Sequence, residues 1–101
     1  LLVVQAAQIV TLIKPQFEAG KEHVGKKGVV RDAGVHETVI ENVIRSAQEY
    51  GLFLRGLTYS PIKGPNGNIE YLAFFSTSSS TEAQENIDVG TVVQAAHKAL
   101  N

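Results

Sequence analysis

The residue with the clearest chemical potential is Lys14, which stands directly at the end of an apolar run. Residues 9–13 are apolar or β-branched without interruption, and a short run of this kind is typical of a strand buried on both faces of a sheet. Pro15 disfavours the helical region for the residue before it, so Lys14 is expected to be extended. The edge formed by such strand ends is where open α/β sheets bind ligands. Position alone leaves two interpretations open, an active-site lysine or a strand-end lysine that extends into water.

A carboxylate occupies a comparable position at the start of a later apolar segment. Glu70 follows the turn-rich segment 60–68, which holds two prolines and two glycines. Asn68 is expected to fix the loop that delivers Glu70, whereas Gly64 and Gly67 are expected only to permit a turn with positive φ. Without further information, Glu70 could equally be an ordinary charged residue at the start of a strand.

The third candidate group is basic. Residues 14–31 carry five basic and two acidic side chains, a local charge of +3, whereas the whole chain has a net charge of −1. A basic edge of this kind is consistent with one face that meets phosphate. The candidates for salt-dependent phosphate contacts are Lys21, Lys26, Lys27 and Arg31. The alternative interpretation is a solvated loop.

The elements that must position these residues form an α/β pattern. After the strand at 9–13, residues 16–31 are polar and too rich in glycine for a stable helix, so a loop is expected. Asp32 is expected to cap an amphipathic helix that Gly51 ends. The apolar stripe of that helix comprises Val35, Val39, Ile40, Val43, Ile44, Ala47 and Tyr50.

Two further strands and a final helix complete the pattern. Residues 52–59 and 70–76 are expected to be strands. The second is mostly apolar and is therefore expected to be central, and it would run antiparallel because a loop joins the two. Residues 77–87 are predicted to be a linker rich in serine, threonine and glutamate. Asp88 is expected to cap a helix with an apolar stripe formed by Val89, Val92, Val93, Ala96 and Leu100.

Composition narrows the class of protein. With 101 residues, the chain can form one domain with a modest core. It contains no cysteine, which excludes disulfides and thiolate metal sites, and no apolar run approaches the length that spans a bilayer. The histidines His23, His36 and His97 lack ligand-like spacing, so no metal is assigned.

Two longer motifs connect the candidate residues. Residues 14–36 read KPQFEAGKEHVGKKGVVRDAGVH, and residues 64–72 read GPNGNIEYL. Together they resemble the TlyA (haemolysin-A-like) family of ribosomal RNA ribose methyltransferases, a branch of the FtsJ-like enzymes. The resemblance covers roughly residues 9–75, and the last dozen residues look similar too.

The resemblance implies an architecture. The chain would be the C-terminal half of a Rossmann-like methyltransferase sheet, in the order strand, helix, strand, antiparallel strand, with an added C-terminal helix. Residues 1–76 would belong to this domain, 77–87 would be the linker, and 88–101 would form a helix that packs on the same domain. Residues 1–8, which do not begin with methionine, would be the end of a truncated crossover.

The resemblance also implies site roles. FtsJ-like enzymes use a Lys-Asp-Lys-Glu tetrad to hold and activate the ribose 2′-hydroxyl; Lys14 matches the second lysine and Glu70 the glutamate. A hydroxyl must lose its proton as it attacks the methyl group of a sulfonium, so Lys14 could accept that proton or stay charged and position the ribose. Glu70 would orient the hydroxyl or a lysine. The other two tetrad residues and the S-adenosylmethionine site would belong to the upstream half.

The expected function is therefore ribose 2′-O-methylation of ribosomal RNA by a longer cytoplasmic polypeptide, and this chain alone is expected to be inactive. Its partners would be ribosomal RNA and the upstream half, or a second copy at the open sheet edge. The alternative is a non-catalytic α/β module that binds RNA or protein. Membrane damage is not expected, because neither helix combines a strong apolar face with a lysine-rich polar face.

Overall fold

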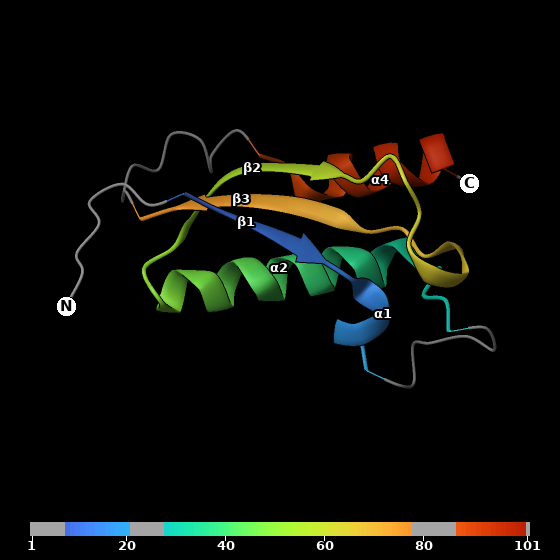
Figure 1. The fold of residues 1–101 in the computed structure, drawn as a ribbon, viewed down its shortest axis with the longest axis horizontal. Helices are drawn as coiled ribbons and strands as arrows, with labels where there is room; N and C mark the ends of the chain where they lie inside the picture. Colours follow the sequence, from blue (N-terminus) through green and yellow to red (C-terminus); the bar gives the residue numbers. More distant parts are fainter. Residues whose placement is uncertain (1–7, 21–27, 78–86, 101) are drawn as a thin grey trace.

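The described part of the protein forms a small three-stranded antiparallel sheet and two long helices. The computed structural model describes residues 8–20, 28–77 and 87–100. In chain order, its elements are β1 (Gln8–Ile13), α1 (Pro15–Glu18), α2 (Ala33–Glu49), β2 (Phe53–Tyr59), the 3-10 turn η2 (Pro65–Gly67), β3 (Tyr71–Ser76) and α4 (Val89–Leu100). The strand order is β1-β3-β2, and β3 is antiparallel to both neighbours (Figure 1). The predicted central, antiparallel third strand is confirmed.

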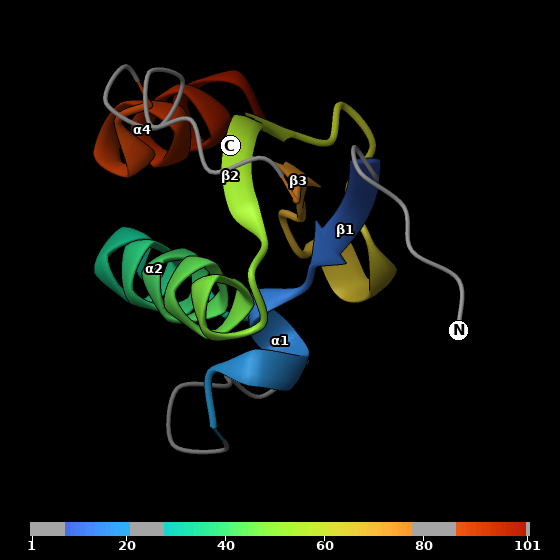
Figure 2. The same ribbon diagram turned by 90° about the vertical axis from the view of Figure 1, so that its left-hand side faces the viewer.

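Both long helices lie on the same side of the sheet (Figure 2). Side chains alternate across a strand, and in β3 the residues Tyr71, Ala73 and Phe75 face the helices and are buried. Buried apolar surface of this kind is the main stabilising contribution to the fold. The core comprises Ile13, Val39, Ile40, Leu54, Ile69, Tyr71, Ala73, Phe75, Val93 and Ala96.

The prediction that the first strand is buried on both faces is wrong for this chain. The apolar run does form β1, but Val10 is 60% exposed and Leu12 is 44% exposed, and among the apolar residues of the strand only Ile13 is fully buried. The reason is that Val10 and Leu12 alternate with the inward-facing Ile13 and therefore face away from the two long helices. Within the described part of the chain, both long helices cover the opposite face of the sheet.

The predicted helix boundaries are confirmed by their caps. The Asp32 carboxylate accepts a hydrogen bond from the backbone N–H of Gly34 at 2.8 Å and from that of Val35 at 3.4 Å. Gly51 has a φ of +76° directly after α2, the left-handed conformation that ends helices and favours glycine. The Asp88 carboxylate caps α4 by accepting from Thr91 at 3.2 Å.

The spread of the tyrosines and phenylalanines along the sequence predicts core residues rather than a base-stacking platform, but three of them are exposed. Tyr50 is 84% exposed because it is the C-cap of α2, where the helical backbone ends and the side chain leaves the apolar stripe. Phe17 is 73% exposed on α1, and Phe74 is 39% exposed because it faces away from the two long helices. The prediction holds for the inward-facing aromatic residues Tyr71 and Phe75.

The loop predicted for residues 16–31 begins instead with a helical turn. Lys14 is extended, as predicted, with φ −118° and ψ 95°, and it is the N-cap of α1. Pro15 occupies the first helical position, where its missing N–H costs no hydrogen bond. Glycine enrichment argued against a long helix but not against a single turn at the start of the segment.

Some predicted features lie outside the described residues. Of the expected crossover end, only Gln8 is described, and of the expected linker, only Thr77 and Ile87 are described. The domain boundaries at residues 76 and 88 therefore stay a prediction. Among the described helices, none has the length and apolar character needed to cross a membrane.

Candidate functional site

The sheet register brings Lys14 and Glu70 to the same place. Ile13 at the end of β1 pairs with Tyr71 at the start of β3. Lys14 and Glu70 are therefore the next residues outward on two antiparallel neighbours. Figure 1 shows β1 leading into α1 at the end of the sheet where the loop containing η2 also lies.

The side chains of Lys14 and Glu70 do not form an ion pair in the described part of the chain. The Lys14 ammonium instead lies 5.8 Å from the centroid of the Phe17 ring, within the range of a cation–π interaction. Lys14 and Glu70 are thus neighbouring residues in the strand register, but the Lys14 side chain extends toward Phe17 of α1.

Glu70 is held in a narrow, largely buried position. Its side chain is 7% exposed, and its Oε2 accepts a hydrogen bond of 2.8 Å from Nε2 of Gln16. The carboxylate also lies against Gly64: a methyl group added there would come within 2.5 Å of the Glu70 Cδ. Gly64 therefore provides space for the carboxylate.

This finding corrects the prediction for Gly64. Its φ is −76°, an ordinary value, so the residue is not needed for a positive φ. Gly67, with a φ of +86°, does have the predicted conformation, and the preceding Asn66 shares it at +61°. The two glycines of the GPNGN segment thus have different roles: Gly64 lets the Glu70 carboxylate approach the backbone closely, and Gly67 adopts the positive φ that the turn requires.

Asn68 fixes the loop that leads to Glu70. The side chain is 2% exposed. Its Nδ2 donates to the carbonyl of Gly28 at 2.7 Å and to that of Pro65 at 2.9 Å, and its Oδ1 accepts from the backbone N–H of Val30 at 3.0 Å. These three hydrogen bonds join the η2 loop to the segment that precedes α2.

The short helix α1 explains how Gln16 reaches Glu70. Pro15 is fully buried and anchors the turn, while the Glu18 carboxylate accepts from the backbone N–H of Lys14 at 3.1 Å. The backbone N–H of Ala19 then donates to the carbonyl of Pro15 at 3.0 Å. The KPQFE sequence thereby forms a compact turn whose third residue, Gln16, faces the carboxylate.

A buried histidine lies behind the site, and sequence reasoning did not find it. His36 is fully buried, with Nε2 2.8 Å from the carbonyl of Val30 and Nδ1 2.8 Å from the Tyr71 hydroxyl. Since a carbonyl only accepts, Nε2 carries the proton and the Tyr71 hydroxyl donates to Nδ1. Burial lowers the pKa of His36 and raises that of Tyr71. No short-range signal links residues 36 and 71; only the fold brings them together.

Of the four residues predicted to contact phosphate, the structure describes only Arg31. Arg31 is exposed directly after Val30, at the end of the segment that Asn68 holds. Lys21, Lys26 and Lys27 lie outside the described residues, so their role stays a prediction. No group of three or more potential metal ligands occurs among the described residues.

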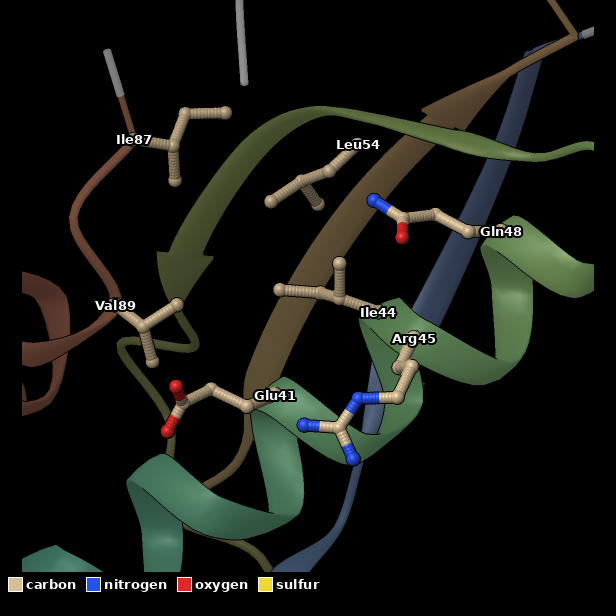
Figure 3. Close-up of a pocket in the computed structure, with 7 residues that line it drawn as sticks. All are labelled: Glu41, Ile44, Arg45, Gln48, Leu54, Ile87 and Val89. Carbon is tan, nitrogen blue, oxygen red and sulfur yellow. The ribbon is translucent and has the colours of Figure 1, made fainter. Parts of the chain in front are cut away.

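A pocket elsewhere on the molecule contains none of the candidate residues. It has a volume of about 290 Å³ and lies between α2, β2 and the start of α4 (Figure 3). Its lining residues are Glu41, Ile44, Arg45, Gln48, Leu54, Ile87 and Val89. The candidate site is therefore the sheet end around Lys14 and Glu70, not this pocket.

Comparisons with known proteins show which proteins the chain resembles. Residues 1–77 match the model of the FtsJ-like methyltransferase family. The chain is 43% identical to the candidate rRNA methyltransferase YqxC of Bacillus subtilis, covering 98% of this chain and 36% of that protein. It is 38% identical to the 16S/23S rRNA (cytidine-2′-O)-methyltransferase TlyA of Mycobacterium tuberculosis, covering 94% of this chain and 34% of that protein.

The fold is similar to a solved structure as well. A candidate haemolysin from Streptococcus thermophilus superposes with a TM-score of 0.86 at 43% identity, over 97% of this chain and 35% of the other. The chain thus spans about a third of the length of these relatives. Their sequence and structural similarity extends over nearly all of it, and the chain belongs to the FtsJ-like methyltransferases of the TlyA/haemolysin family.

Proposed function

We propose that a whole protein carrying this chain methylates ribose 2′-hydroxyls in ribosomal RNA, with Lys14 and Glu70 at the reacting hydroxyl. The observation that carries the proposal is the register of β1 and β3, which makes the residues Lys14 and Glu70 neighbours at one end of the sheet. The relative TlyA is named for 2′-O-methylation of cytidine in rRNA, which supports this substrate class. A cytoplasmic location would follow from the proposed substrate.

The described residues do not by themselves form a nucleotide-type cofactor site. Such sites lie where neighbouring parallel strands diverge, next to a glycine-rich turn. Here the two parallel strands, β1 and β2, are separated by the antiparallel β3. We therefore assign S-adenosylmethionine, the methyl donor that FtsJ-like enzymes use, to the part of the whole protein outside this chain.

The roles of this chain's residues follow from their chemistry. The hydroxyl must be oriented and must lose its proton as its oxygen forms a bond to carbon. In the described part of the chain, Glu70 accepts only the Gln16 hydrogen bond at Oε2, so Oε1 is free to accept from the hydroxyl. Lys14 would leave the Phe17 ring by side-chain rotation and either take the proton as a neutral amine or hold the ribose as a cation.

The test is methyl transfer by a polypeptide of the relatives' full length that carries this chain. With ribosomal RNA and labelled S-adenosylmethionine, Lys14→Ala and Glu70→Gln should each lower kcat by about 100-fold or more, because each removes a group at the reacting atoms. Lys98→Ala, on the exposed side of α4, is the matched control. Activity that survives both site substitutions would refute the site assignment.

The second candidate function is RNA or protein binding without catalysis. The observation that favours it is the local charge of +3 between residues 14 and 31. Under this alternative, the combined Lys26→Glu and Lys27→Glu exchange would abolish RNA binding, while Lys14→Ala would leave all measurable function intact. Loss of methyl transfer in Lys14→Ala with RNA binding retained would decide for the enzyme.

A further inference from the structure

We infer that Gln16 is a positioning residue that orients the Glu70 carboxylate toward the ribose hydroxyl; the inference rests on the proposed function above. Gln16 stands at the second position of α1, on the turn that the buried Pro15 anchors. Glu70 comes from the other side of the site, just before β3. The contact between them joins the two motifs that carry the candidate chemistry.

The carboxylate is held from two sides. Nε2 of Gln16 donates to Oε2 at 2.8 Å, while Gly64 leaves the space that the carboxylate fills. This arrangement fixes one oxygen and leaves Oε1 without a hydrogen bond in the described part of the chain. A carboxylate with one oxygen fixed and the other available is oriented for a single incoming donor.

The type of residue also matters, because an amide donates without carrying charge. A lysine or arginine at this position would form an ion pair with Glu70 and neutralise it. Gln16 holds the carboxylate and leaves its negative charge uncompensated. That charge is what a hydroxyl donor, or the ammonium of Lys14, would require from Glu70 at the reacting centre.

Stability alone does not explain Gln16. Its Oε1 is buried and has no hydrogen-bond partner among the described residues. Burying an unpaired acceptor disfavours the folded state. A methionine would fill nearly the same volume without this penalty, although it would also remove the hydrogen bond that Glu70 Oε2 accepts. The buried, unpaired oxygen of Gln16 thus offsets part of the stability that its hydrogen bond to Glu70 contributes, a combination found at functional sites.

The experiment compares Gln16→Met with the parent in the full-length polypeptide. Loss of orientation should lower kcat roughly 10- to 100-fold, with the KM values for RNA and S-adenosylmethionine changed less than about twofold, since neither binding surface is altered. The midpoint of urea unfolding should fall only slightly, because removal of the unpaired Oε1 partly offsets the loss of the hydrogen bond to Glu70. Gln94→Met, on the exposed side of α4, is the matched control and should leave kcat unchanged.

A double-substitution cycle with Glu70→Gln separates positioning from an independent contribution. If Gln16 acts through Glu70, then Gln16→Met should cost little further activity in the Glu70→Gln background. Independent, additive losses would overturn the inference, as would a fall in kcat matched by a large loss of stability. Parent-level kcat in Gln16→Met would also overturn it.

The same data keep the two proposals apart. A full-length polypeptide that is inactive on ribosomal RNA, or that is indifferent to Glu70→Gln, refutes the proposed function. An active polypeptide that depends on Glu70 but not on Gln16 refutes only the present inference.

Discussion

Two polar clusters meet at the start of β3, and they differ in how completely their groups are paired. The anchor cluster consists of His36, Asn68 and Tyr71, and every polar side-chain atom in it has a hydrogen-bond partner. The site cluster consists of Gln16 and Glu70, and it leaves the buried Oε1 of Gln16 unpaired. The adjacent residues Glu70 and Tyr71, at the start of β3, thus belong to clusters of different character.

The difference shows how one short segment can serve stability and chemistry at once. Buried polar groups that are fully paired make the fold rigid and specific, while unpaired ones are costly for folding. Pairing the anchor cluster fixes the backbone around residues 68–71. The site cluster can then keep unpaired oxygens without losing its geometry. The two clusters should accordingly respond differently to substitution, to pH and to steric change.

The largest expected effect is on the anchor cluster. His36→Ala removes a fully buried ring and leaves the Tyr71 hydroxyl and the Val30 carbonyl without their partners. We expect it to lower the free energy of unfolding by about 3 kcal/mol, combining the cavity with the unpaired groups. Urea denaturation followed by circular dichroism measures this value.

Its control is Ser46→Ala on the exposed side of the same helix, which should change stability by less than about 0.5 kcal/mol. If His36→Ala were equally mild, the anchor cluster would not be a stabilising unit and the comparison of the two clusters would fail.

The next effect is the pH dependence of stability. Burial lowers the pKa of His36 below its ordinary value of 6.5, helped by the nearby His97 and opposed by the Val30 carbonyl and by Asp32. The unfolded chain therefore takes up this proton more readily than the folded chain. Stability should be constant above about pH 6.5 and should fall as the pH drops below it, until folded His36 is itself protonated.

Urea midpoints between pH 8 and pH 5 measure this dependence, and His36→Gln should flatten the curve because it removes the titrating group. His97 lies in ring contact, at 4.8 Å between centroids, and it remains in that variant. An unchanged slope in His36→Gln would assign the pH dependence to other groups.

The sequence predicted the elements better than the contacts between them. Helix caps at Asp32 and Asp88 and the glycine end of α2 are local, since each depends on backbone a few residues away. The central position of β3 followed from its apolar composition, and its antiparallel direction followed from the loop, rather than a crossover helix, that precedes it. The motifs also predicted the neighbourhood of Lys14 and Glu70, which stays a proposal as a catalytic pair.

What the sequence did not show depends on distant residues. The pairing of Tyr71 with His36 exists only when β3 packs on α2. The role of Gly64 depends on the position of the Glu70 side chain, whereas a glycine in a segment with two prolines indicates a turn when only the sequence is considered. The exposure of β1 could not be predicted from its apolar composition, because composition does not say which face of the sheet the helices cover.

The smallest effect on stability is expected within the site cluster, for Gly64→Ala. The φ of −76° suits alanine, and the added methyl group meets only the far end of the flexible Glu70 side chain. Stability should therefore change by less than about 1 kcal/mol, because lower chain entropy in the unfolded state offsets the crowding. In the full-length polypeptide, however, kcat should fall at least about tenfold as the carboxylate leaves Gln16.

Gly67→Ala is the matched control, because it reverses the pattern within the same loop. Its φ of +86° is unfavourable for alanine, yet no atom lies within 4 Å of the added methyl group. It should therefore cost about 1 kcal/mol of stability and leave the contact between Glu70 and Gln16 in place. If Gly67→Ala lowered kcat more than Gly64→Ala did, turn geometry rather than carboxylate position would govern the site, and the distinction between the two clusters would not extend to catalysis.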